Sequence, residues 1–354
     1  MAWVTKNPHT WVVIEDQKSG KKLEIYNDET PNHDFTIPFE VNFSDAATPA
    51  VNTVTFYNIS KAHADFPKKG MKIYLYFNWG SSKKLICEGF ITKVDSTQHD
   101  GVTDSKVLSF TEGTNYSNVK ANRLKVEKKK TVHKHKIIKV TKDGHYENKR
   151  VSVPSVETYK RGPHKGEKHT VNHWHTKQVW VPAKTENRRV PYRETKTARS
   201  NKTYKKGTTY RALIQGIANQ CGIKIDRIQL HKNPKLTRPY TAKGKPLTLI
   251  KQLVQKTESI INYRKGKFEI IDPKAEKRTW IDIDDQDLVQ PPSNNEADNG
   301  KETWEVTTPL IPDITVGVGI NMKSKYLKGR FYVKAGQHTS DGENPQTQCS
   351  LAAM

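Results

Sequence analysis

The chain has 354 residues, a hydrophobic fraction of 34%, a charged fraction of 27% and a net charge of +23 at pH 7. This length accommodates two or three domains with modest cores, and the charge indicates an anionic partner, either a nucleic acid, an anionic surface or an acidic protein. No segment approaches the roughly 18 to 20 apolar residues that cross a bilayer, and the N-terminus lacks the apolar core of a secretory signal, so we expect no membrane anchor and a protein kept in a cytoplasm until it is assembled or released.

Residues 9 to 111 show the period-two alternation of β-strands. The clearest case is 35–43, whose apolar residues fall on one face and predict a half-buried strand. These residues are Phe35, Ile37, Phe39, Val41 and Phe43. We expect further strands at 9–15, 23–26, 51–59, 71–79, 86–94 and 107–111. At least six strands in about 115 residues, with turns between them, predict a β-barrel or sandwich.

The basic charge is concentrated between Lys125 and Lys206, with 24 Lys and Arg residues against 7 Asp and Glu, a local net charge of +17. Seven of the 13 histidines also fall here: His133, His135, His145, His164, His169, His173 and His175. The other 272 residues carry only +6. The basic character therefore belongs to one segment, which indicates an insertion or a separate module.

This basic segment has the pattern of β-hairpins. A first hairpin is predicted from 132–140 and 150–154, with a turn signal at Lys142–His145. A second is predicted from 171–175 and 179–182, continued by 189–193, and 160–166 has the composition of an exposed loop. Trp174 and Trp180 need a surface that buries them. We therefore expect long hairpins with weak cores, braced by a neighbouring chain.

After Gly207 the apolar residues change to a helical period. The first helix is predicted to begin at an N-cap at Thr208 or Thr209 and to end at Gly222. Its apolar positions are Tyr210, Leu213, Ile214, Ile217 and Ala218. The second has Pro246 near its first turn and apolar residues at Leu247, Ile250, Leu253 and Val254. Ile260–Tyr263 and Phe268–Ile271 then predict a tight hairpin that turns at 264–266.

The last fifty residues predict three short strands with polar turns between them. Ile314–Val318 and Ile320–Ser324 alternate, and Gly329 turns the chain into Arg330–Val333. Such a meander is typical of a small β-barrel.

The order of short motifs resembles the hub proteins of phage tail baseplates and tail tips, in the group that includes PBSX-like, Mu-like and late-control D proteins. At the C-terminus the motif is Leu310-x-Pro-x-Ile-x-Val-Gly317, followed by Ser324-x4-Gly-Arg-Phe-x-Val333. Near the N-terminus it is Val54-x-Phe-Tyr-Asn-Ile-Ser60, with Lys69-Gly-Met-x-Ile-x-Leu75 and Cys87-Glu-Gly-Phe-Ile91. The two predicted helices and the following hairpin also match this group. The likeness covers roughly 250 residues in the same order, and nothing carries over to the basic segment.

The resemblance implies a mainly β fold with a small α+β part, in which two β-barrel domains are joined by an α/β domain. We expect barrels at 1–124 and 276–354, an α/β domain at 207–275 and a basic, His-rich β-hairpin insertion at 125–206. It also implies a structural part of the virion tail, at the baseplate or tail tip, that forms a homotrimeric ring and is assembled in the host cytoplasm. The expected partners are a hexameric distal-tail or tail-tube ring protein, a central spike or fibre protein and a tape-measure protein, with DNA only in transit.

Candidate chemical groups favour structural interpretations. Cys87, Cys221 and Cys349 are odd in number and sit among apolar neighbours, so we expect free core thiols rather than disulfides or ligands. His173 and His175 share a strand face, as do His133 and His135, but no accompanying ligands have zinc spacing. The acidic run Asp282–Asp287 alternates with isoleucines, which favours a strand edge and turn over catalysis or calcium binding. No nucleophile elbow, phosphate-binding loop or His-Glu-x-x-His motif is present, so we predict no enzyme, no cofactor and no metal.

The basic segment supplies the candidate contact residues. Lysines and arginines interleaved with aromatic residues suit phosphate contacts and stacking, but we favour docking onto acidic surfaces of neighbouring tail proteins. The candidates are Lys128, Lys129, Lys130, Arg150, Arg161, Trp174, Trp180, Arg188, Arg189 and Arg193. The alternative function is that of a DNA-binding protein acting through 125–206. A tail-associated peptidoglycan hydrolase is a third reading without supporting residues.

Overall fold

The computed structural model describes residues 7–28, 30, 33–296 and 302–354, except for the side chains of Lys128 and Glu296. The chain forms two compact units, one made of residues 1–126 and 201–354 and the other of residues 127–200. Most of the described chain is β-strand, which confirms the mainly β fold class. The described part of the chain holds no helix that could span a membrane.

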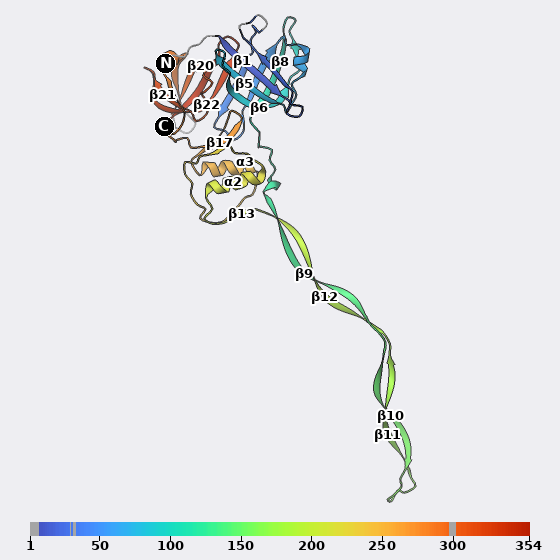
Figure 1. Ribbon diagram of the computed structural model, residues 1–354. Helices are drawn as coiled ribbons and strands as arrows, with labels where there is room; N and C mark the ends of the chain where they lie inside the picture. The colour runs from blue at the N-terminus through green and yellow to red at the C-terminus, as the bar shows by residue number, and fades with distance from the viewer. Residues whose placement is uncertain (1–6, 29, 31–32, 297–301) are drawn as a thin grey trace. The chain divides into compact units, whose positions relative to one another are not determined.

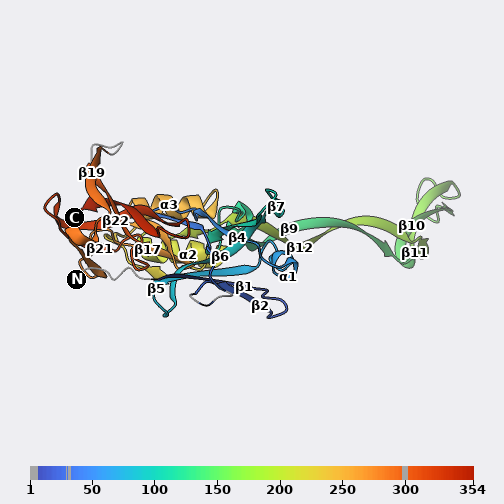
Figure 2. The same cartoon turned by 90° about the horizontal axis from the view of Figure 1, so that it is seen from above.

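The first half of the larger unit is an antiparallel sheet around one apolar core. Its strands are β1 (Pro8–Glu15), β2 (Lys22–Tyr26), β3 (Phe39–Ser44), β4 (Val51–Tyr57), β5 (Lys72–Trp79), β6 (Lys84–Val94), β7 (Gln98–His99) and β8 (Asp104–Glu112), with the short helix α1 (Lys61–Asp65) between β4 and β5. Hydrogen bonds link them in the order β3-β4-β8-β6-β5-β1-β2. Figure 2 shows β1 and β2 together at one edge.

The alternation at 35–43 predicts burial correctly. Ile37, Phe39, Val41 and Phe43 are all buried, but the strand begins only at Phe39. Pro38 precedes it, and proline cannot donate a backbone hydrogen bond to a neighbouring strand. The alternating pattern therefore extends further than the strand that it predicts.

The last part of the chain extends the same sheet. It contains β18 (Trp280–Ile283), the 3₁₀ turn η2 (Asp285–Asp287), β19 (Gln290–Glu296), β20 (Glu302–Pro309), β21 (Gly319–Lys323), β22 (Lys328–Ser340) and β23 (Gln346–Ala353). β22 pairs with β3 over six residues, from Ala335 opposite Ser44 to Ser340 opposite Phe39. β3 contributes to the cores of both halves, since Phe39 and Val41 pack in the first and Phe43 packs in the second.

Gly336 lies at this join because no other residue fits there. A Cβ atom on Gly336 would lie 2.5 Å from the carbonyl oxygen of Gln348 and 2.7 Å from the ring of Phe43. The absence of a side chain at Gly336 therefore lets the Phe43 ring of the first half pack directly against β22.

One predicted strand, Ile314–Val318, is wrong. The Ile314 amide donates to the Ile311 carbonyl at 3.0 Å, and the Val318 amide donates to the Thr315 carbonyl at 3.1 Å, so the segment consists of successive turns. Gly317 has a φ of +77°, which extended strands do not adopt. Ile314, Val316 and Val318 are nevertheless buried, because alternate residues of these turns point into the second core.

The segment between these parts is a small α/β layer, in which α2 and α3 lie side by side (Figure 1). It contains the 3₁₀ turn η1 (Ala121–Leu124), β13 (Thr203–Tyr204), α2 (Tyr210–Cys221), β14 (Arg227–Ile228), β15 (Tyr240–Thr241), α3 (Pro246–Gln255), β16 (Ile260–Arg264) and β17 (Lys267–Ile271). The Thr209 side chain caps α2, and Gly222 ends it in the left-handed conformation at φ +70°. The prediction of both helices and of the β16–β17 hairpin is confirmed.

The smaller unit is a single long hairpin (Figure 1). β9 (Lys125–Lys142) pairs with β12 (Lys184–Asn201), and β10 (His145–Thr158) pairs with β11 (Lys168–Val181). The predicted turn at Lys142–His145 is wrong, because His145 pairs with Val181 and the chain reverses only after Thr158. Asp143 and Gly144 interrupt one strand opposite Pro182 and Ala183, so the break in the pattern marks a discontinuity of the ribbon and not its end.

Glu112, at the end of β8, is a buried carboxyl group within the larger unit. Its Oε1 accepts a bond from the Gly266 amide at 3.4 Å, and the neighbouring Gly113 amide donates to the Glu88 carbonyl at 2.9 Å. Burial raises the pKa of Glu112 from 4.5 to about 7, against the lowering effect of the backbone bonds from Gly266 and Lys265 and with a smaller contribution from Glu269. The folded chain therefore favours the protonated acid.

We predict that Glu112 makes folding stability depend on pH. The raised pKa means that its contribution is complete below about pH 4.5 and is lost as the pH rises through about 7. At about 1.4 kcal/mol for each pH unit, the loss is on the order of 3 kcal/mol. Urea unfolding at pH 5 and pH 8 should show this loss in the natural chain and not in Glu112→Gln. The exposed substitution Glu40→Gln is the control, and a Glu112→Gln variant with an unchanged pH dependence would contradict the assignment.

Candidate functional site

The basic ribbon, Glu127–Ser200, has the most unusual surface of the chain. It carries 20 Lys and Arg residues against 7 Asp and Glu, a net charge of +13. None of its described side chains is buried. A segment without a core gains little from the hydrophobic effect, so its side chains are arranged for contact with something other than the ribbon itself.

Six of the seven acidic residues of the ribbon lie within pairing distance of basic side chains of the ribbon itself. Glu127 pairs with Arg199 at 2.9 Å, Glu157 with His173 at 2.7 Å, and Glu194 with Lys134. Glu147, Glu167 and Glu186 also lie within pairing distance of His145, His164 and Lys142 respectively. Because these acidic residues already have partners, most of the lysines and arginines outside these pairs have no acidic partner among the described residues and face solvent.

Some of the predicted contact residues lie on one face of the ribbon, and the others are distributed along its length. On the β10–β11 pair, Arg150 lies opposite Thr176, Ser152 opposite Trp174 and Tyr146 opposite Trp180. Residues directly opposite one another, and those two positions along, share a face, so Arg150, Trp174 and Trp180 form one aromatic and basic face. Trp174 and Trp180 are 64% and 53% exposed. The predicted need for a burying surface is therefore unmet within the ribbon.

The remaining predicted contact residues lie outside this face. Lys129 and Lys130 are exposed on β9, Arg161 lies in the end loop, and Arg188, Arg189 and Arg193 lie along β12. The side chain of Lys128 lies outside the described residues. The ribbon therefore presents cations along its whole length, and its two exposed tryptophans lie on the β10–β11 part.

Trp180 is held in place although it is exposed. Its ring lies 4.9 Å from that of Tyr146 at an interplanar angle of 60°. A Cβ atom on Gly144 would lie 2.3 Å from the indole, so the ring covers the glycine at the interruption of the ribbon. Glycine at position 144 therefore leaves room for the Trp180 ring, a packing role that the turn interpretation did not predict.

The histidines lie mainly on the opposite face. His145, His169, His173 and His175 occupy the odd-numbered positions of β10 and β11, with valines beside them. His173 contacts Glu157, and His169 stacks on Tyr159 at 3.9 Å. Within the described ranges, His, Cys, Asp and Glu side chains form no group of three or more that could hold a metal ion.

The acidic run Asp282–Asp287 shapes a turn, which confirms the structural interpretation. Asp282 pairs with Lys323 at 2.8 Å. Asp284 and Asp287 form a reciprocal capping box around η2. Asp285 accepts a bond from the Ser324 hydroxyl at 2.6 Å. Cys87, Cys221 and Cys349 are buried and free, as predicted.

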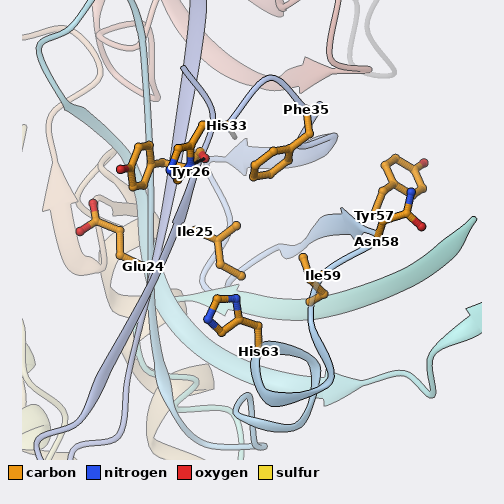
Figure 3. Close-up of a pocket in the computed structure, with 9 residues that line it drawn as sticks. All are labelled: Glu24, Ile25, Tyr26, His33, Phe35, Tyr57, Asn58, Ile59 and His63. Atoms are coloured by element: carbon orange, nitrogen blue, oxygen red, sulfur yellow. Dashed lines mark hydrogen bonds between the residues drawn. The ribbon is translucent and has the colours of Figure 1, made fainter. Parts of the chain in front are cut away.

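A pocket beside the edge strand β2 was not predicted from the sequence (Figure 3). Its volume is about 300 Å³. The lining residues are Glu24, Ile25, Tyr26, His33, Phe35, Tyr57, Asn58, Ile59 and His63. Tyr26 and His33 stack at 4.3 Å, so one wall consists of two parallel rings. The lining of the pocket is mainly apolar.

The fold is similar to that of two solved tail proteins. The 43 kDa tail protein of prophage MuSo2 from Shewanella oneidensis matches with a TM-score of 0.53 and 8% identity, over 97% of this chain and 98% of that one. A tail protein from Neisseria meningitidis MC58 matches with the same TM-score and identity, over 97% and 96% of the two chains. The chain has a tail-protein fold. No protein-family model and no curated protein sequence matches it.

The tail-protein fold confirms, for the architecture, the resemblance found in the sequence motifs. The likeness spans nearly the whole chain in both comparisons. Identity this low establishes the fold alone.

We predict that Gly144→Ala displaces the Trp180 indole. The added methyl group would overlap the ring, so the indole must leave the glycine and the Tyr146 contact. The indole N–H signal of Trp180, assigned with Trp180→Phe, should move in a ¹H–¹⁵N NMR spectrum. Thr141→Ala, which removes only a hydroxyl contact with Thr185 at 3.2 Å, is the control. A Trp180 signal that is identical in Gly144→Ala and the natural chain would exclude this packing.

Proposed function

We propose that the chain is a structural hub of the baseplate or tail tip of a phage or phage-derived tail. The observation that carries the proposal is the tail-protein fold, which spans 97% of the chain. The continuous sheet supports it, because a mechanical part needs halves that do not separate. The buried, structural roles of the cysteines and of the acidic run also favour a structural protein over an enzyme.

In this proposal, three copies form a ring. The parts 1–124 and 276–354 act as two similar barrels, 207–275 links them and 125–206 is an inserted arm. Two barrels in each of three copies would offer six related surfaces to a hexameric tube or distal-tail ring, while the threefold axis would suit a spike or fibre. Exposed apolar residues of the larger unit support further burial on assembly. They include Val51, Val102, Val289 and Tyr326.

The ring would close the tail tube before ejection and open for the tape-measure protein and DNA. Contacts in a closed threefold ring join two different surfaces of each subunit. Such permanent interfaces commonly bury more than 2,000 Å² in total, so the isolated chain is expected to assemble or to await its partner.

A second candidate function is DNA binding through the basic ribbon. The observation in its favour is the surplus of exposed cations beside Trp174 and Trp180. It accounts for residues 127–200 and leaves the tail-protein fold of the rest unexplained, so we place it second.

The native mass of the full chain at moderate salt tests the hub. We expect a mass of three chains for the protein alone, or a complex of three hub and six ring chains when it is mixed with a hexameric tail-ring protein. A chain that is monomeric in both samples would contradict the hub and favour the DNA-binding candidate.

A further inference from the structure

A second excess of positive charge lies in the α/β layer, outside the ribbon. Residues 201–257 contain 13 Lys and Arg residues and a single acidic residue, Asp226. The ribbon mixes its cations with seven acidic residues, six of which lie within pairing distance of its own basic side chains. A surface without acidic residues leaves its cations available to an external anion.

Backbone hydrogen bonds bring two cationic segments together. The Gly207 amide donates to the Leu236 carbonyl at 2.9 Å, and the Leu236 amide donates to the Thr208 carbonyl at 2.8 Å. The Ala242 amide donates to the Lys202 carbonyl at 3.0 Å. These bonds join 202–210 to 234–242, so the lysines that flank the bonded residues on both segments lie together.

The resulting cationic patch consists of Lys205, Lys206, Lys235, Arg238, Lys243 and Lys245. All six side chains are exposed, and none has an ion-pair partner among the described residues. Like charges gathered in this way repel one another. This repulsion raises the electrostatic free energy of the unbound patch, and binding of an anion would lower it.

The two helices add to the positive potential at the patch. Thr209 and Lys245 are the N-caps of α2 and α3, and neither helix has an acidic residue in its first turn. Lys245 provides no side-chain cap. Helix N-termini carry partial positive charge, which here reinforces the lysines and arginines.

The composition of the patch favours nucleic acid over protein. Protein interfaces are depleted in lysine and enriched in exposed apolar and aromatic residues. No large hydrophobic side chain between residues 201 and 257 is exposed. Lysine and arginine without apolar neighbours are the groups that contact the phosphate backbone of DNA irrespective of sequence.

We propose that this patch binds the phosphodiester backbone of a nucleic acid. The site is independent of the ribbon and goes beyond a ring-forming role. It would hold nucleic acid without reading its sequence, because the cations stand on short turns that carry no element able to enter a groove.

Two full-length variants with equal charge test the proposal. The patch variant carries Lys205→Gln, Lys206→Gln, Lys235→Gln, Arg238→Gln and Lys243→Gln. The ribbon variant carries Lys129→Gln, Lys130→Gln, Arg161→Gln, Arg188→Gln and Arg189→Gln. Each loses five positive charges, so a difference between them reports position and not net charge. A third variant, with Arg at the four lysine positions and Lys at 238, keeps the charge of the patch.

Fluorescence anisotropy with a labelled duplex, between about 50 and 200 mM salt, gives affinity and salt dependence. We expect the patch variant to lose roughly tenfold or more in affinity, with a smaller dependence of affinity on salt. The ribbon variant should stay within about threefold of the natural chain, and the charge-keeping variant should bind like it. Unfolding midpoints and native masses of all variants show whether folding and ring formation are intact, so failure of the hub is separable from failure of the patch.

Several outcomes would overturn the proposal. One is a natural chain that does not bind the duplex, and another is a ribbon variant that loses as much affinity as the patch variant. Equal competition by polyglutamate or by anionic phospholipid vesicles would assign the patch to an acidic protein or to a lipid surface instead.

Discussion

The pairing of β3 with β22 is the contact on which the rest of the larger unit depends. It joins a strand near the N-terminus to one near the C-terminus over six residue pairs and puts Phe39 and Phe43 into different cores. Such a long-range contact carries a loop-closure cost, which the burial of apolar surface on both sides offsets. Because β3 and β22 are joined in this way, the α/β layer and the basic ribbon need not enter the sheet.

The α/β layer and the basic ribbon make different use of this freedom. The α/β layer has its own core, formed by α2, α3 and β17, and its charges therefore stand on a defined framework. The ribbon buries nothing and relies on backbone pairing and on contacts such as that of Trp180 with Gly144. We infer that the α/β layer can present a fixed pattern of cations, whereas the ribbon gains most from a partner that covers its aromatic face.

Much of the local structure was predictable because it depends on near neighbours in the sequence. Thr209 caps α2 with its side chain, and Gly222 ends it in the left-handed conformation. Lys265 and Gly266 turn the β16–β17 hairpin in the left-handed region. The buried alternation of Ile314, Val316 and Val318 was predicted, but the turns that produce it were not. The periodicity of apolar residues indicates which of them are buried, not which backbone conformation buries them. Here Gly317 allows successive turns, instead of a strand, to bury alternate residues.

Features that depend on distant residues were not predictable. Nothing local to Ala335 or Ser44 indicates that they pair, and Asp143-Gly144 has the same composition whether it turns a hairpin or interrupts one. The net charge of the chain outside 125–206 did not reveal the cationic patch, because positive and negative segments offset one another. Outside 125–206 the net charge of +6 combines +9 over 207–257 with −3 elsewhere, and only the hydrogen bonds around Leu236 bring those charges together.

Native-state hydrogen exchange on the β3–β22 ladder would test most directly whether the two halves form one cooperative sheet. The account predicts that amides of β3, β4 and β22 exchange with one common free energy, equal to that of global unfolding, and with the same dependence on denaturant. The account would be contradicted if the β22 amides exchanged through a separate opening of lower free energy while β4 remained protected. That result would show that the halves fold independently.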